Sequence, residues 1–154
     1  FDLALDVAIQ ADSKIVAAGF TDASGTRDFA LARYNANGSL DVNFGPGGRV
    51  TTNFGGTRDA ATGLAIQADD KIVAAGVSNA SGARDFALAR YNTDGTLDIS
   101  FGTGGRVTTD FGGGDGGNAV AFEPKGKIVV AGSSNASSTF DFALARYSAG
   151  GPSN

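Results

Sequence analysis

The side chains able to do chemistry in this chain are carboxylates, guanidinium groups and hydroxyls. Its 154 residues include no His, Cys, Met or Trp. The usual general base and zinc ligand are therefore missing, as are thiol nucleophiles, disulfides and cysteine–zinc sites. A metal would need oxygen ligands, which suits calcium or magnesium. No Gly-x-Ser-x-Gly nucleophile motif occurs, so the composition favours binding over catalysis.

Five polar residues interrupt an otherwise repeated pattern, and they are our candidates for ligand binding: Arg58, Asp59, Asp115, Asn118 and Glu123. Asp59 and Asp115 lie in corresponding loops, and a pair of carboxylates is what a glycosidase uses. The polar loops 21–24, 78–81 and 134–137 join these candidates, because binding sites commonly lie on loops held by a rigid scaffold. Solvated loops are the alternative, and no residue is assigned as catalytic.

Two charged positions recur in every repeat. They are occupied by Asp28, Asp85 and Asp141, and by Arg33, Arg90 and Arg146. A ring of equal charges could line a channel or bind an anion. We favour a structural ion pair or hydrogen-bond network tying strand to loop, because a scaffold needs the same contacts in each repeat and an active site needs asymmetry.

The turns 35–41 and 92–98 are similar to acidic calcium loops, with Asn-x-Asn-Gly and Asn-x-Asp-Gly. They lack the Glu that an EF-hand loop carries at its twelfth position. We interpret them as Asx-type hairpin turns and expect no metal or cofactor, with calcium as the alternative. Tyr34, Tyr91 and Tyr147 are expected to pack with their hydroxyls at the rim, since no Trp supports a sugar-binding platform.

These residues are set in an internal repeat of 56–57 residues. The segment Lys14–Gly19 recurs at 71–76 and 127–132, and the string DFALARY begins at 28, 85 and 141. Residues 8–54 align with 65–111 without a gap, with 35 identities in 47 positions. We divide the single domain, 1–154, into repeats 1–54, 55–111 and 112–154. The Gly-rich run 112–117 is interpreted as a linker between repeats.

Each repeat is predicted to form four short strands. The first strands are expected at 7–9, 64–66 and 120–122, the second at the KIVAAG segments, the third at FALARY, and the fourth at 49–54 and 106–111. Large Phe29 and Leu31 point to one face of the third strand and small Ala30 and Ala32 to the other, so both faces are expected to be covered. Four-stranded sheets stacked face to face form an all-β propeller. A β-sandwich is the alternative.

The motifs resemble the bacterial delta-60 repeat family. They are the KIVAAG strand, the DFALARY strand, Gly38 to Asp41, Phe44-Gly45, and Gly47 to Thr52, with the same order in the second repeat. The third repeat departs after Tyr147. The resemblance implies a propeller-like repeat protein of bacterial secreted or surface location, and it implies no catalytic residues.

Three blades, the last lacking its fourth strand, are too few to close a ring of about four to eight. We expect either two chains forming a six-bladed ring, a two-fold homodimer, or the remainder of a longer propeller, and the start at Phe1 suggests a fragment or processed product. The net charge of −4 disfavours nucleic acid, and no apolar run approaches the about 20 residues of a membrane-spanning helix. We predict a non-catalytic scaffold presenting loops to a protein or glycan. The alternatives are a secreted esterase- or glycosidase-like hydrolase with its site at the tunnel, and a lectin-like binder with repeated sugar sites.

Overall fold

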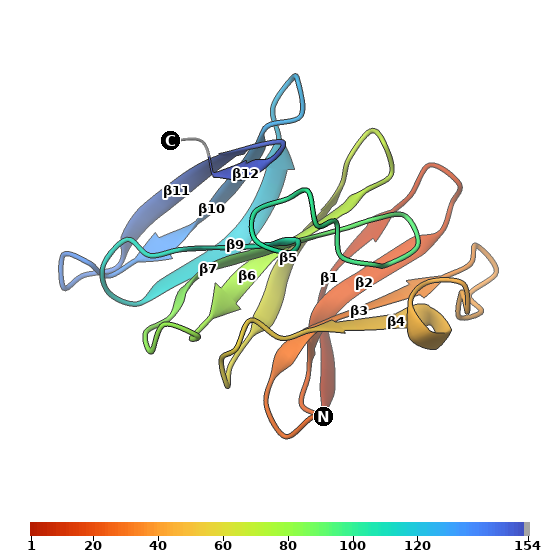
Figure 1. Cartoon of the computed structure of the whole chain (residues 1–154), viewed down its shortest axis with the longest axis horizontal. Helices are drawn as coiled ribbons and strands as arrows, with labels where there is room; N and C mark the ends of the chain where they lie inside the picture. The colour runs from red at the N-terminus through yellow and green to blue at the C-terminus, as the bar shows by residue number, and fades with distance from the viewer. Residues whose placement is uncertain (153–154) are drawn as a thin grey trace.

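The computed structural model describes residues 1–152, which form three four-stranded antiparallel sheets, here called blades 1 to 3. They follow one another from red to blue in Figure 1. Blade 1 contains β1 (Asp2–Ile9), β2 (Ile15–Thr21), β3 (Asp28–Tyr34) and β4 (Arg49–Thr52), with a short 3-10 helix, η1 (Pro46–Gly48), before β4. Blade 2 contains β5 (Ala60–Ile66), β6 (Ile72–Ser78), β7 (Asp85–Tyr91) and β8 (Arg106–Thr109). Blade 3 contains β9 (Asp115–Phe122), β10 (Ile128–Ser134), β11 (Asp141–Ser148) and β12 (Gly151–Pro152).

The strands of each blade pair in chain order, so each blade is an antiparallel meander. The first strands lie beside one another, β1 with β5 and β5 with β9. This arrangement confirms the predicted all-β blades. The fourth position of blade 3 holds only the two-residue β12, which pairs with Tyr147 and Ser148. Blade 3 thus lacks, within the described residues, the four-residue strand present as β4 and β8, as the sequence predicted.

The first strands begin several residues earlier than the sequence predicted. Each contains a β-bulge, which leaves Leu5, Thr62 or Asn118 out of register with the second strand. A bulge breaks the alternation of large and small residues on which the prediction relied. In blade 3 the strand also includes Gly116 and Gly117, so the linker predicted at 112–117 ends at residue 114.

Opposite each bulge lies a glycine of the second strand: Gly19, Gly76 or Gly132. A Cβ atom there would lie 1.8–1.9 Å from a backbone oxygen of the first strand. The final Gly of each KIVAAG-type segment is therefore required by this close approach of two backbones.

The blades stack through unlike faces. We call the face of the third strand that carries Phe29, Leu31 and Arg33, and its equivalents in the other blades, the large face; the opposite face is the small face. Between blades 1 and 2 the core combines the large face of one with the small face of the other: Val16, Ala18, Phe29, Leu31, Phe44, Ala61, Leu64, Ile72, Ala74, Ala87, Ala89 and Tyr91. The next core repeats this arrangement with Phe86 and Leu88 against Ala143 and Tyr147.

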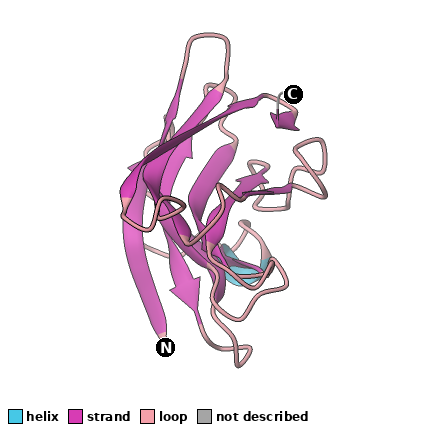
Figure 2. Ribbon diagram, turned by 90° about the vertical axis from the view of Figure 1, so that its left-hand side faces the viewer, coloured by secondary structure: helices cyan, strands magenta, loops and turns pink. Residues whose placement is uncertain are grey.

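Both faces of blade 2 are covered, and all seven residues of β7 are buried. Figure 2 shows the strands as stacked layers with the loops around their edges. In residues 1–152, no helix has the length and apolar character needed to cross a bilayer.

Candidate functional site

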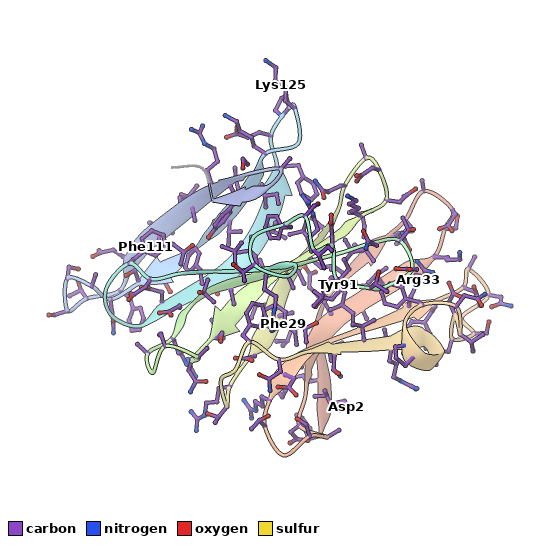
Figure 3. All side chains as sticks on the ribbon, viewed as in Figure 1. Asp2, Phe29, Arg33, Tyr91, Phe111 and Lys125 are labelled. Atoms are coloured by element: carbon purple, nitrogen blue, oxygen red, sulfur yellow. The ribbon has the colours of Figure 1, made fainter. Side chains whose placement is uncertain are left out.

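Arg33 links β3 to loops of two blades. Its Nε donates to Asp41 Oδ2 at 2.9 Å, and its guanidinium carbon lies 4.5 Å from the centre of the Phe44 ring. Nη1 donates to the Thr93 carbonyl in the hairpin turn of blade 2, at 2.5 Å. Because Arg33 is buried and occupied by these partners, it joins blade 1 to blade 2. Figure 3 shows Phe29, Tyr91 and Arg33 in the layer between these blades.

Arg90 makes the same contacts one blade further on. It donates to Asp98 at 2.9 Å, lies 4.7 Å from the centre of the Phe101 ring, and reaches the Ala149 carbonyl in blade 3. Arg146, the third member of the series, has a side chain 59% exposed and lies 3.8 Å from Glu123. Two of the three repeated arginines therefore bridge blades, and the third lies on an open face.

The carboxylate of Asp98 is stabilised in its charged form. Burial acts to raise its pKa, but hydrogen bonds from Lys71 Nζ and from Ser100, together with the charge of Arg90, hold the pKa of Asp98 well below its usual range. The pKa of Asp41 is also lowered. Burial acts to raise this pKa, but the Asn43 backbone N–H, the Arg33 guanidinium and Lys14 together lower it by a larger amount. These carboxylates accept hydrogen bonds and are poor proton donors at neutral pH.

Asp59 and Asp115, two of the predicted ligand-binding residues, are buried where the chain crosses from one blade to the next. Asp59 Oδ2 accepts from the Phe54 N–H at 2.8 Å, and the Asp59 N–H donates to the Arg27 carbonyl at 2.9 Å. Asp115 repeats both contacts, with the Phe111 N–H and the Arg84 carbonyl, each at 2.6 Å. Both carboxylates therefore hold the crossover in place.

The other three predicted residues are dispersed. Arg58 is exposed beside the crossover, Asn118 is the bulge residue of β9, and Glu123 follows the far end of β9. Because β9 rises about 3.3 Å per residue, Asp115 and Glu123 lie roughly 26 Å apart. The five residues thus do not form one site.

Arg58 does line a polar pocket at the loop end of the blades. The pocket, of about 340 Å³, lies between the β2–β3 loop of blade 1 and the crossover, and it is lined by Asp22, Gly25, Thr26, Arg27, Thr57 and Arg58. Arg27 is held there by the ring of Phe20, 4.4 Å away. This pocket offers two guanidinium groups and several hydrogen-bonding groups close to solvent.

The repeated aspartates at the start of the third strands do not pair with the repeated arginines. Asp28 accepts from Ser24 at 2.7 Å, and Asp141 accepts from Ser137 at 2.5 Å, both within the β2–β3 type loop. Asn79 and Asn135 lie in the candidate loops 78–81 and 134–137, and their side-chain oxygens accept hydrogen bonds from the backbone of the crossover segments. The sequence named these loops as candidates for binding a ligand, but it did not show that the two Asn side chains hold the crossovers.

Two of the repeated tyrosines form hydrogen bonds between blades. The Tyr91 hydroxyl is buried and lies 2.8 Å from Thr52 Oγ1 of blade 1, and Tyr147 lies 2.8 Å from Thr109 Oγ1 of blade 2. Burial raises the pKa of both tyrosines. The predicted position at a solvated rim is therefore wrong for Tyr91, whose side chain is fully enclosed.

The two outer blade faces differ in shape. The small face of blade 1 is hollowed by a groove of about 440 Å³, lined in part by Ala17, Gly19, Ala30, Ala32 and Tyr34. The large face of blade 3 projects Phe142 and Leu144, which are 101% and 66% exposed. No described residue of the chain covers either face.

This stack of four-stranded meanders, joined by crossovers that buried aspartates hold, defines a β-propeller repeat protein. The family described as "Domain of unknown function (DUF5122) beta-propeller" matches residues 10–44, 67–101 and 124–151, one segment in each repeat and more than half of the chain together. The chain belongs to this family, which confirms the propeller-type repeat recognised from the motifs. No curated protein matches the chain.

Proposed function

We propose that this chain is a non-catalytic propeller scaffold whose ring is completed by a second copy and whose loops bind a protein or glycan partner. The observation that carries the proposal is the complementarity of the two outer faces. The same two kinds of face are already joined twice within one chain, which supports a second copy of the chain as the cover of the open faces.

The seam between blades 2 and 3 shows how the faces fit. The Phe86 ring of the large face lies over Gly132, where a Cβ atom would be 2.8 Å from its terminal carbon. The equivalent pair across an open seam is Phe142 of one copy over Gly19 of the other, and Gly19 lines the groove of blade 1. In the proposed seam, the exposed Phe142 ring would therefore pack over Gly19 as the Phe86 ring packs over Gly132.

The polar contacts extend in the same way. Arg33 and Arg90 each donate to a backbone carbonyl in the turn that follows the third strand of the next blade. The acceptors are Thr93, which follows Asn92, and Ala149, which follows Ser148. The corresponding carbonyl in blade 1 is that of Ala36. Arg146 of one copy would thus bond to Ala36 of the other, and burying Phe142 and Leu144 would supply the apolar contribution.

Two copies joined through both seams form a closed, two-fold ring of six blades. The loops after the second strands, and the pocket with Arg27 and Arg58, would then lie at one end of the ring. Rigid scaffolds present binding loops in this manner, and repeated loops would give a multivalent partner higher avidity.

The experiment compares two substitutions of an exposed apolar residue by aspartate. Phe142→Asp places a charge in the open seam, whereas Ile99→Asp changes a residue that is 81% exposed in a loop of the central blade. We expect sedimentation analysis to show Phe142→Asp as a monomer and Ile99→Asp as a dimer. A Phe142→Asp variant that stays dimeric would contradict the proposed seam, and a monomeric wild-type chain would leave these faces to further blades of a longer protein.

A further inference from the structure

Three carboxylates meet where blade 2 passes into blade 3. Asp85 begins β7, Asp110 follows β8 and Asp115 begins β9, and one carboxylate oxygen of each lies within 4.8 Å of the others. Oxygens bound to a common Ca²⁺ ion at about 2.3–2.6 Å are spaced over this range. None of the three carboxylates forms an ion pair with a described residue.

Two of these carboxylates have oxygens that lack a partner although they are enclosed. Asp85 and Asp115 are 3% and 2% exposed, and the Oδ1 atom of each is buried with no hydrogen-bond donor among residues 1–152. A buried charged oxygen without a donor or cation is costly. Asp59 Oδ1 at the first junction also lacks a donor, whereas Asp28, the counterpart of Asp85, has one from Thr26. The buried Asp85 Oδ1 is therefore the oxygen that gives this cluster its own unmet need for positive charge.

Two of the differences from the equivalent junction between blades 1 and 2 change the groups next to these carboxylates. Asn53 stands where Asp110 stands, and its side-chain oxygen accepts from the Gly55 N–H, which leaves an NH₂ group as its other polar atom. Thr26 stands where Ala83 stands and donates to Asp28 at 3.4 Å. The second junction has thus gained a carboxylate and lost a hydroxyl donor.

Asp110 itself is arranged to contribute an oxygen. Its Oδ1 accepts from the Gly112 N–H at 2.6 Å, the counterpart of the Asn53 contact. Its second oxygen is left for another partner, and the residue is exposed, so an ion can enter from solvent. Asp115 is in turn held by the Phe111 N–H at 2.6 Å through its other oxygen.

We propose that Asp85, Asp110 and Asp115 bind one Ca²⁺ ion, with water completing its coordination, and that this ion fastens blade 3 to blade 2. The site differs from the turns 35–41 and 92–98 in which the sequence suggested calcium as an alternative. Those turns use their Asn and Asp oxygens to accept from their own Ser39 and Thr96. The proposed ion replaces the donor that the first junction obtains from Thr26.

The test is calcium titration of metal-free protein by calorimetry, together with thermal unfolding in calcium and in chelator. The wild-type chain should bind one ion per chain, and saturating calcium should raise its Tm by roughly 5 to 10 °C. Asp110→Asn introduces the residue that the first junction has at the equivalent position, Asn53, so we expect this variant to fold like the wild type. It should lose the calcium-dependent Tm shift and should be at least as stable as the wild type in chelator, because one of three mutually repelling charges is gone.

Asp69→Asn is the matched control, since it removes the same charge from an exposed turn, and it should keep the full calcium response. Absence of stoichiometric binding in millimolar calcium would overturn the proposal. So would an Asp110→Asn variant with an unchanged response, or an equal response of the wild type to Mg²⁺. Because the site lies within one chain, these outcomes do not depend on whether the ring closes.

Discussion

At the scale of single residues, the chain uses its few charged groups as connectors. Arg33 and Arg90 each bind a carboxylate, an aromatic ring and a carbonyl of the next blade. The recurrence of these arginines predicted a repeated polar network, but it did not identify the partners. Asp28 and Arg33 stand at opposite ends of β3, about 16 Å apart at the strand rise, which excludes a direct pair. Asp41 and Asp98 reach the arginines only because the turn after the third strand folds back.

Because the pKa of Asp98 is lowered in the folded state, the free energy of unfolding should depend on pH in the acidic range. A carboxylate whose pKa is lower in the folded state stabilises the fold above its unfolded value of about 4 and loses that contribution as pH falls. The free energy of unfolding should therefore fall as the pH is lowered from about 5 to about 3. Asp98→Asn should cost about 3 kcal/mol at neutral pH, because it leaves Arg90 buried without its counter-charge.

Urea unfolding at several pH values measures both effects. The variant should show a weaker dependence on pH than the wild type over the acidic range. An identical pH dependence in the two proteins would show that Asp98 is not the group responsible.

At the scale of strands, periodicity predicted the second, third and fourth strands closely and the first strands poorly. The second and third strands are regular, so their apolar runs match the paired residues from Ile15 to Tyr34. The first strands contain a bulge and, in blade 3, two glycines. Strand propensity does not anticipate glycine in a strand; its reason is the packing of Gly117 close to Gly76 of the preceding blade.

The hydrogen bond between the hydroxyls of Tyr91 and Thr52 is a contact between blades that sequence alone did not reveal. Tyr91→Phe should lower the free energy of unfolding by about 1–2 kcal/mol, because it leaves the buried Thr52 hydroxyl without this partner. Tyr34→Phe, at the equivalent position on the small face of blade 1, should change stability by less than about 0.5 kcal/mol. Chemical denaturation compares the two, and equal losses would show that the Tyr91 hydroxyl contributes nothing specific to the seam.

At the scale of the whole molecule, the repeat predicted blades, and the structure showed which face meets which. The alternation of large and small residues in DFALARY indicated covered faces. It did not show that the faces join in one direction only, large onto small. The same directionality leaves a protruding face on blade 3 and a hollowed face on blade 1. The roles of the candidate binding residues were less predictable. Sequence alone does not distinguish a non-repeated carboxylate that is exposed to solvent from one that, like Asp59, accepts a hydrogen bond from the backbone.

The mass of the unmodified chain in solution tests the central claim most directly. One chain has a mass of 15.4 kDa. Light scattering during size-exclusion chromatography over a range of concentrations should give a single species of twice that mass, because in the proposed ring the Phe142 face of each copy packs on the Gly19 groove of the other. A folded species that keeps the mass of one chain throughout would contradict the six-bladed ring.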